Sequence, residues 1–469
     1  MTQAAAVTHL TRAERAAVGK AARERVGRAS LGEVLADGRA DAVELLEGQA
    51  TSRVAELVPI RYGRMSTSPF AFYRGGALLM AADLARTPHS GLTVQLCGDA
   101  HLSNFGVFAT PERRLIFDIN DFDETHPGPF EWDVKRLAAS FAVAGRENGF
   151  VEKDRRRVLL ATATAYREAM RDLAGKGNLE VWYTHLDTAE AVKQIGKTLG
   201  KERETRAKAV LRKAWTRDSV QALSKLTTVV DGRPKILSQP PLLVPIDELW
   251  GAEAAAEAFV TLQKLVRSYR LTLASDRRHL LEQFQLIEIA RKVVGVGSVG
   301  TRAWILLFEG IDGKDPLFLQ AKEAQTSVLA GFVKASHVPR NQGERVVHGQ
   351  RLMQAASDTF LGWQRAAGPD GIERDFYLRQ LRDGKASAVI ETMTPDDMVL
   401  YGRLCGTTLA RAHARSGDRV AIAAYLGSGK VFDEAMATFA ESYADLNAQD
   451  SAALVAAIAD GTVTAETGV

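Results

Sequence analysis

The spacing of hydrophobic and polar positions changes twice along the chain. Up to about residue 283, most segments are rich in alanine and charged residues, with apolar positions at helical intervals, as in residues 1–50 and 151–215. From 284 to 385, β-branched and aromatic residues replace alanine, and short apolar runs alternate with glycine-containing turns. Helical spacing returns from 386 onward. The pattern therefore predicts an α+β protein in which a sheet-forming segment lies between two helical ones.

Five short strands are predicted between residues 284 and 385, with a helix that opens at Glu344 before the last two. The third strand, PLFLQAKEA, contains Lys322 near its end. The fifth strand, RDFYLRQL, leads into Gln380 and Leu381. The segment is therefore predicted to form a small antiparallel sheet.

A glycine-rich loop joins the first two of these strands. Its sequence, GVGSVG, holds Gly295, Gly297, Ser298 and Gly300. Loops of this spacing bind phosphates in dinucleotide-binding folds and in kinase-like proteins. A dinucleotide-binding fold needs a helix directly after the glycines, whereas the residues that follow, TRAWILLFEG, are typical of a strand. The flanking segments favour a kinase-like nucleotide loop, and a plain antiparallel sheet with glycines at its turns is the alternative.

A group of polar residues follows the apolar run 93–96, which predicts a short buried strand. A polar loop and a hairpin come next, and the second arm of the hairpin is predicted over 115–119. Like charges do not usually gather at strand ends without a counter-ion, and Mg²⁺ prefers carboxylate and amide oxygens. The segment predicts a magnesium site, unless its acidic residues serve only as turn formers. The polar residues of this segment are Asp99, His101, Asn104, Asp118, Asp121 and Asp123.

Composition excludes several classes of protein. The chain has 469 residues, which is enough for two or three domains. It carries 60 basic and 57 acidic residues, and the net charge of +3 is too small to indicate a nucleic-acid partner or an anionic membrane surface. The two cysteines, Cys97 and Cys405, exclude a disulfide framework and indicate a reducing compartment. No uncharged apolar run is long enough to span a bilayer, so a cytoplasmic protein is expected.

The loop that follows Cys97 resembles a known catalytic motif. The segment GDAHLSN, from Gly98 to Asn104, is similar to the HGDxHxxN catalytic loop of aminoglycoside and choline kinase-like phosphotransferases, with Cys97 in place of the usual histidine. In that family a second aspartate follows on a neighbouring strand, and another begins a helix about a dozen residues later. Asp121 and Asp133 have this spacing in the present chain.

The resemblance implies roles in catalysis and metal binding. Phosphoryl transfer needs a carboxylate that accepts the proton of the attacking hydroxyl, together with a carboxylate and an amide that hold the metal. By resemblance, Asp99 is the base, and Asn104 and Asp121 are the Mg²⁺ ligands. Asp118 and Asp123 are the alternatives to Asp121 as the principal carboxylate ligand.

Supporting and nucleotide-binding roles also follow from the resemblance. His101 and Asp133 are implied to hold the catalytic loop in place. Lys322 is implied to grip the phosphates of ATP, with Glu344 as the partner that positions it. The remaining residues implied to bind the nucleotide belong to the glycine loop and to a hinge, and they are Gly295, Gly297, Ser298, Gly300, Gln380 and Leu381.

The order of these motifs is unusual. In kinases the glycine loop and the lysine precede the catalytic loop, whereas here they follow it by about two hundred residues. The segment DDMVLYGRLCGTTLARAHARSGD resembles the helix that leads into the catalytic loop, yet no GDxHxxN follows it. A circular permutation of a two-lobed kinase-like fold accounts for both observations and leaves the mechanism unchanged. The expected units are an N-terminal helical arm (1–60), a helical lobe with the catalytic loop (61–283), the nucleotide-binding sheet (284–385) and C-terminal helices that complete the helical lobe (386–469).

Over most of its length, the chain resembles the bacterial domain-of-unknown-function family 2252, through FYRGG, GDAHLSNFG, NDFDE, GVGSVGTR and LQAKEA. That family is similar to the kinase-like superfamily but supplies no substrate. The expected function is ATP- and Mg²⁺-dependent transfer of a phosphoryl group to a hydroxyl-bearing acceptor, a small molecule rather than a protein. Two alternatives stay open. One is AMP transfer to a protein, with Arg64 or Arg74 gripping an inverted triphosphate, and the other is a nucleotide-binding scaffold without activity.

Overall fold

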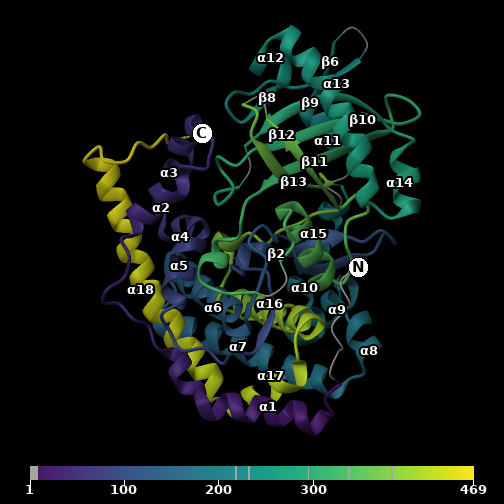
Figure 1. Cartoon of the computed structure of the whole chain (residues 1–469). Helices are drawn as coiled ribbons and strands as arrows, with labels where there is room; N and C mark the ends of the chain where they lie inside the picture. Colours follow the sequence, from purple (N-terminus) through teal and green to yellow (C-terminus); the bar gives the residue numbers. More distant parts are fainter. Residues whose placement is uncertain are drawn as a thin grey trace.

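The computed structural model describes residues 9–216, 219–230, 233–293, 295–335, 338–368, 370–381 and 384–468. A part that contains the main sheet lies above a mostly helical part in Figure 1. Helices and small antiparallel sheets alternate along the chain, which confirms the predicted α+β class.

Six antiparallel strands form the main sheet. They are β8 (Leu243–Pro245), β9 (Gln285–Lys292), β10 (Ala303–Glu309), β11 (Pro316–Ala324), β12 (Gly362–Ala367) and β13 (Glu373–Gln380). Their order is β12-β13-β11-β10-β9-β8, so the five predicted strands are present and β8 is added at one edge. Lys322 of β11 lies opposite Ala303 of β10 and Tyr377 of β13, which places it in the middle of the sheet.

Helices cover both faces of this sheet because both faces carry apolar side chains. The helices of this part are α11 (Ser219–Leu226), α12 (Ile246–Trp250), α13 (Ala252–Tyr269) and α14 (Ser275–Leu281). Leu319 of β11 belongs to the same apolar cluster as Tyr269 of α13, whereas Phe318 clusters with Leu226 of α11. Side chains alternate along a strand. Lys322 therefore lies on the face that carries Phe318.

The helical part is built around a buried helix. Its elements are α6 (Phe130–Glu147), α7 (Glu152–Gly175), α15 (Gln342–Met353), α16 (Pro395–Ser416), α17 (Arg419–Leu426) and α18 (Val431–Ala459). The residues of α6 from Phe130 to Gly145 are all buried. Gly406 of α16 allows close packing on α7, since a Cβ at this position would lie 2.4 Å from the carbonyl oxygen of Thr162. Most of the apolar core lies in this part.

Two hairpin-like pairs of strands lie where the two parts meet. They are β1 (Thr93–Leu96) with β4 (His126–Pro129), and β2 (Phe105–Ala109) with β3 (Leu115–Ile119), which a short β5 (Leu186–Asp187) extends. The predicted limits of β1 and β3 are confirmed. The end of α16 reaches β1, because the hydroxyl of Ser416 accepts a hydrogen bond from the backbone N–H of Gln95 at 3.2 Å.

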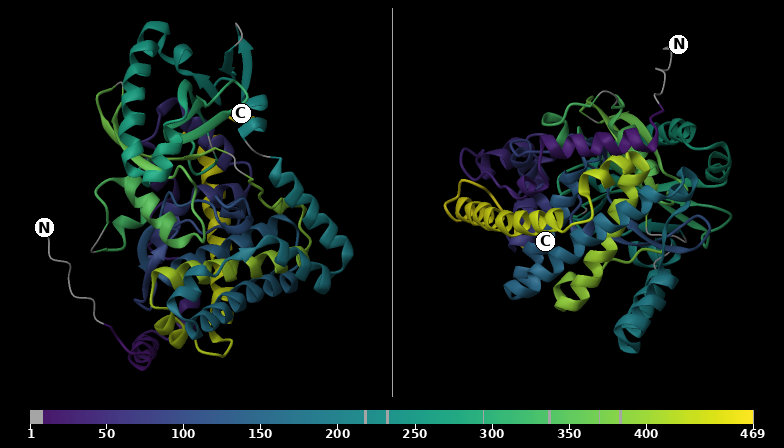
Figure 2. Two further views of the ribbon diagram at one scale, coloured as in Figure 1. Left: turned by 90° about the vertical axis from the view of Figure 1, so that its right-hand side faces the viewer. Right: turned by 90° about the horizontal axis from the view of Figure 1, so that it is seen from below.

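In Figure 1 the N-terminal segment crosses the bottom of the molecule and then follows its left side. Its helices are α1 (Arg12–Arg25), α2 (Ala42–Ala50), α3 (Val58–Met65), α4 (Pro69–Gly75) and α5 (Ala77–Leu84). Helices α8 (Asn178–Tyr183), α9 (Thr188–Leu199) and α10 (Lys201–Trp215) continue from α7, and the views of Figure 2 show α9 and α10 projecting from the body. The hairpin of β6 (Thr227–Val230) and β7 (Arg233–Ile236) is also present, but its turn residues lie outside the described part of the chain.

Two local elements have identifiable causes. The stretch FAFYRGG forms α4 and not a turn, because Pro69 starts the helix and the hydroxyl of Ser68 caps it by accepting from the N–H of Ala71. Near the C-terminus, Val431–Ala459 is one continuous helix of 29 residues. Its alanine-rich middle favours continuation of the helix.

Cys97 and Cys405 are both buried as free thiols. Within the described ranges, no helix combines the length and the apolar character that crossing a membrane requires.

Candidate active site

Five chain segments meet around one cavity of about 430 Å³ between the two parts of the molecule. They are the loop after β1, the loop after β3, the glycine loop between β9 and β10, the end of β11 with the residues that follow it, and the N-terminal segment that includes α4. Polar residues of these segments that line the cavity are Asp99, His101, Asn104, Asp121, Asp123, Glu124, Ser298, Arg53 and Arg74. The cavity thus collects most of the residues that the sequence singled out.

Asp133 anchors the loop after β1. One of its carboxylate oxygens accepts from the N–H of Cys97 at 2.8 Å, and the other accepts from the N–H of Gly98 at 3.1 Å. His413 of α16 lies 3.2 Å from the same carboxylate and also contacts the hydroxyl of Tyr166 at 2.9 Å. The buried carboxylate therefore fixes the backbone directly before Asp99.

Glycine is required at position 98 of this loop. Gly98 has φ +85°, and a Cβ there would lie 2.1 Å from the carbonyl oxygen of Glu124. Both the backbone conformation and the close approach exclude a side chain. This approach brings the loops after β1 and β3 together.

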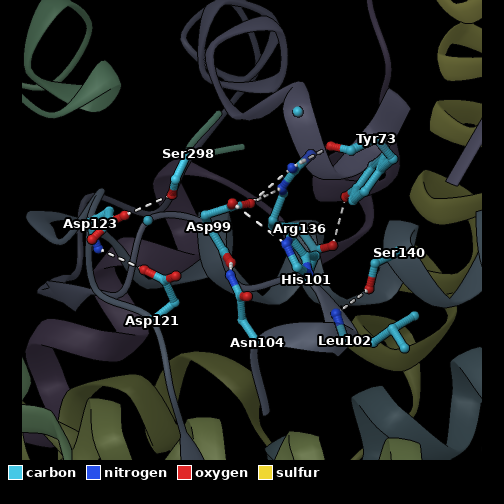
Figure 3. Close-up of polar contacts among 12 residues, drawn as sticks. Tyr73, Asp99, His101, Leu102, Asn104, Asp121, Asp123, Arg136, Ser140 and Ser298 are labelled. Carbon is cyan, nitrogen blue, oxygen red and sulfur yellow. Dashed lines mark hydrogen bonds and ion pairs between the residues drawn. The ribbon is translucent and has the colours of Figure 1, made fainter. Parts of the chain in front are cut away.

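Asp99 is paired with Arg136, which lies one turn after Asp133 on α6 (Figure 3). The Nε and Nη2 atoms of Arg136 are each 2.9 Å from Oδ1 of Asp99, and Nη2 also donates to the carbonyl of Tyr73 at 2.7 Å. His101 lies 3.7 Å from the other carboxylate oxygen. Burial raises the pKa of Asp99, although Arg136 offsets part of this effect. Asp99 is therefore a more basic carboxylate than an exposed one.

Asn104 and Asp121 are the residues that could hold Mg²⁺. The amide nitrogen of Asn104 donates to the carbonyl of Asp99 at 2.8 Å, which orients the side chain and leaves its oxygen as the metal-binding atom (Figure 3). Asp121 keeps 31% of its side chain exposed, and both residues line the cavity. Among the described residues no group of three or more His, Cys, Asp or Glu could hold a metal ion. A nucleotide-bound Mg²⁺ needs only one or two such protein ligands, since phosphates and water complete its shell, so this pair fits.

Lys322 forms ion pairs with both aspartates of the loop after β3. Its ammonium contacts Asp123 directly and lies 3.9 Å from Asp121. Asp123 also accepts from the hydroxyls of Tyr377 at 2.6 Å and Ser298 at 3.2 Å, and the contact with Ser298 ties it to the glycine loop. Burial alone would lower the pKa of Lys322, but the two carboxylates outweigh it and raise the pKa. The lysine is held charged.

The protein itself therefore supplies the counter-ions of the acidic cluster. The acidic cluster was expected to need a bound cation. The structure instead pairs three of its carboxylates with protein cations, in the pairs Asp99–Arg136, Asp123–Lys322 and Asp118–Arg411. The reason is that buried arginine and lysine side chains arrive from distant segments. The number of carboxylates therefore gives no support for a bound metal. The support for Mg²⁺ at Asn104 and Asp121 is the type of oxygen ligand that these two side chains offer.

Asp118 does not line the cavity. It is buried on β3, where its carboxylate contacts Arg411 and accepts from the N–H of Ala355 at 2.8 Å. The structure does not bring Asp118 together with Asn104 and Asp121.

Glu344 does not contact Lys322, contrary to the expected role. Its carboxylate lies 3.7 Å from His348 on the surface of α15. The next residue, Arg345, points inward and donates to the carbonyls of Asp123 at 2.9 Å and Thr125 at 2.6 Å. Neighbouring residues on a helix point about 100° apart. The rotation of α15 thus presents an arginine to the site, and Asp123 takes the place expected of Glu344.

Gln380 and Leu381 lie outside the 430 Å³ cavity. The N–H of Gln380 donates to Asp358 at 2.8 Å, and the N–H of Leu381 donates to the carbonyl of Phe318 at 2.9 Å. Gln380 lines a separate cavity of about 30 Å³. Arg379 lines the same small cavity and donates to the carbonyl of Asn120 at 3.1 Å, which links β13 to the residue before Asp121.

The N-terminal segment holds the glycine loop in place, although residues 1–60 were expected to form a peripheral arm. Arg53 donates to the carbonyl of Val299, and the N–H of Val54 donates to the carbonyl of Gly300 at 2.8 Å. Arg64 of α3 contacts the carbonyl of Gly295 at 3.4 Å. Gly300 has φ +88° and packs against Arg53, so a side chain there would be strained.

Arg136 and Arg53 were missed by sequence reasoning. A signal existed for Arg136, because it follows Asp133 by three positions on a predicted helix and residues three apart share a face. No comparable signal existed for Arg53, whose surroundings in the sequence are rich in alanine and charge and whose partner Val299 lies 246 positions away.

Comparison with known protein families gives one match. The family model described as an uncharacterised protein conserved in bacteria (DUF2252) matches residues 53–457. The matched region begins at Arg53 and includes every segment that lines the cavity except its edge at Gln49 and Ser52. No curated protein and no solved structure matches the chain.

Proposed function

We propose that this chain, which belongs to the DUF2252 family of bacterial proteins, is an ATP- and Mg²⁺-dependent phosphotransferase that acts on a hydroxyl group of a small molecule. One observation carries the proposal. Asp99, Asn104, Asp121 and the glycine loop line a single cavity, and Lys322 is paired with two aspartates at its edge. These are the parts that phosphoryl transfer requires, and they come from distant segments of the chain.

The proposed fold is a circularly permuted kinase-like one. Its support is the contact between Ser416 at the end of α16 and Gln95 of β1, two residues 321 positions apart. In an unpermuted chain, that helix would lead into the strand before the catalytic loop. The sheet segment with the glycine loop and Lys322 then follows in the chain but covers the same cavity.

In the proposed step, Asp99 accepts the proton of the acceptor hydroxyl. The hydroxyl oxygen forms a bond to the γ-phosphorus of ATP, and the bond between that phosphorus and the bridging oxygen breaks, so that ADP leaves. Lys322 does not itself line the cavity but is paired with Asp123, which does, and in the proposed complex it would contact phosphate oxygens. Mg²⁺ bound by Asn104 and Asp121 would neutralise charge on the phosphates.

AMP transfer is the second candidate, and the arginines of the cavity wall favour it. Arg53 and Arg74 line the cavity in addition to the expected groups, and extra cations suit a triphosphate bound in the reverse direction. The two reactions differ in their products. Phosphoryl transfer releases ADP, whereas AMP transfer releases pyrophosphate.

The experiment that tests the proposal is thermal unfolding of the wild type and of Asp121→Ala, with ATP, with Mg²⁺ and with both. Ligand at a hundred times its Kd should stabilise the folded protein by about 2.7 kcal/mol. We expect ATP with Mg²⁺ to stabilise the wild type and the Mg²⁺-dependent part to vanish in Asp121→Ala. Asp172→Ala is the matched control, since that carboxylate on α7 is 66% exposed. No response of the wild type to nucleotide would refute the proposal, and pyrophosphate among the products would favour AMP transfer.

A further inference from the structure

Arg74 differs from the other cations around the cavity. Arg136 is paired with Asp99, Lys322 is paired with Asp123, and Arg53 donates to the carbonyl of Val299. Arg74 lines the cavity, yet within the described ranges its guanidinium forms no hydrogen bond or ion pair, and its Nε atom is buried without a partner. The Nε atom of Arg53 is also buried without a partner, so what distinguishes Arg74 is that no atom of its guanidinium is engaged within the described ranges. A guanidinium that lines a cavity without a protein partner is suited to bind an anionic ligand.

Arg74 lines the cavity together with Asp99 and His101 of the loop after β1, and Asp99 is the carboxylate that would accept the hydroxyl proton. Burial raises the pKa of Asp99, and the charge of Arg74 offsets part of this rise. The pKa of His101 is lowered mainly by burial, and the charge of Arg74 lowers it further. Burial also lowers the pKa of Arg74 itself, which shows that its charge is poorly solvated. An anion bound there would relieve this cost.

The same wall limits the size of the acceptor. The segment that carries Arg74 also carries Val54 and Arg64, whose contacts with Gly300 and Gly295 attach it to the glycine loop. The carbonyl oxygen of Arg74 would lie 3.2 Å from a Cβ at Gly297, so the helix and the loop are in close contact. The cavity is thus bordered on this side by protein, and its volume of about 430 Å³ is that of a small-molecule site.

We infer that the acceptor is a small molecule with a negatively charged group next to its reactive hydroxyl, and that Arg74 binds this group. A phosphate monoester or a hydroxy acid has this chemistry. The identification of the ligand as the acceptor rests on the proposed phosphotransferase function, whereas the presence of an anion site at Arg74 does not depend on that function. Arg74 then sets specificity by favouring a charged acceptor over its neutral analogue.

The test compares anionic and neutral probes. Glycerol 3-phosphate and glycerate are titrated calorimetrically into the protein with ADP and Mg²⁺ and without nucleotide, and glycerol serves as the neutral analogue. The variants are Arg74→Gln, Arg74→Lys and the control Arg171→Gln, which alters an exposed arginine of α7. We expect at least one anion to bind the wild type and Arg171→Gln while glycerol does not. A lost charge-assisted hydrogen bond should weaken that binding roughly 10- to 100-fold in Arg74→Gln, with partial recovery in Arg74→Lys.

Several results would overturn the inference. It fails if neither anion binds the wild type, or if Arg74→Gln binds them as tightly as the wild type does. It also fails if Arg74→Gln weakens ADP binding by the same factor and the anions compete with ADP, because Arg74 would then hold a phosphate of the nucleotide. If no protein binds nucleotide but anion binding still depends on Arg74, the anion site stands and the phosphotransferase proposal fails.

Discussion

Lys322 of β11 forms an ion pair with Asp123 of the loop after β3, although 199 positions separate the two residues. Lys322 is 3% exposed and Asp123 is 26% exposed, so the pair is largely withdrawn from water. Tyr377 and Ser298 donate to the same carboxylate from the sheet and from the glycine loop. A single aspartate thus joins three elements of the sheet-containing part to the helical part.

Removing Lys322 should be costly for stability. Lys322→Met leaves Asp123 and Asp121 without their cation, and loss of one partner of a buried pair typically costs about 3 kcal/mol or more. Lys322→Met with Asp123→Asn should recover part of the loss. Urea unfolding of the four proteins should therefore give a coupling free energy of roughly 1–3 kcal/mol. If the losses in unfolding free energy of the two single variants simply add up in the double variant, the ion pair makes no specific contribution to stability.

Asp133→Asn should loosen the loop after β1. An asparagine keeps one oxygen acceptor but places an NH₂ group against the second of the two backbone N–H donors, those of Cys97 and Gly98. Leaving a buried donor unsatisfied costs about 1–3 kcal/mol, and more where a charge was involved. Denaturant unfolding measures the loss. The control is Asp172→Asn, an exposed change on α7 that should have little effect.

Arg136→Gln should move the acid limb of activity to higher pH. A general base must be ionised, so the rate falls as the pH falls through the pKa of Asp99. Burial raises this pKa and Arg136 lowers it, so removing Arg136 should raise it further. The measurement is the pH profile of ADP release from ATP with water as acceptor. An unchanged acid limb in a folded Arg136→Gln would argue against Asp99 as the base.

Glu124 should make the folded state less stable as the pH rises. Burial raises the pKa of Glu124 from 4.5 to about 7, although the N–H of Val328 and the charge of Arg345 favour the ionised form. The folded protein therefore holds this proton more tightly than the unfolded chain. The contribution is fully present below pH 4.5 and is lost between about pH 4.5 and pH 7, by at most about 3 kcal/mol.

Glu124→Gln should abolish that dependence, because glutamine can still accept from the N–H of Val328 but does not ionise. The variant should gain stability relative to the wild type as the pH increases from 5 to 8. Glu112→Gln, an exposed change in the turn between β2 and β3, is the control and should follow the wild type. Parallel curves for Glu124→Gln and the wild type would show that Glu124 stays ionised in the fold.

Local patterns were enough to predict much of the architecture. The limits of β1 and β3 follow from apolar runs bounded by turn residues, and the five strands between 284 and 385 follow from their β-branched and aromatic content. The spacing from Gly98 to Asp133 pointed to residues that the structure brings together. Such patterns succeed where the interaction that matters is encoded within one or two neighbouring elements.

Pairing between distant segments was not predictable in the same way. Whether Glu344 or Arg345 faces the site depends on how α15 is rotated against the loop after β3, and the sequence of the helix alone does not determine this. The same holds for Arg53, whose partner is a backbone carbonyl that any residue could present. Which carboxylates are neutralised by the protein likewise depends on arginine and lysine side chains of distant elements.

The contact between Ser416 and Gln95 has a consequence for synthesis on the ribosome. Strand β1 emerges early, but helix α16, whose end packs beside it, emerges only after another 300 or so residues have been made. Contacts of such long sequence separation form slowly, because the entropy of closing the intervening chain must be paid first. The nascent chain therefore carries the loop after β1 in an incomplete environment during most of translation, and the candidate site takes shape as one of the last events of folding.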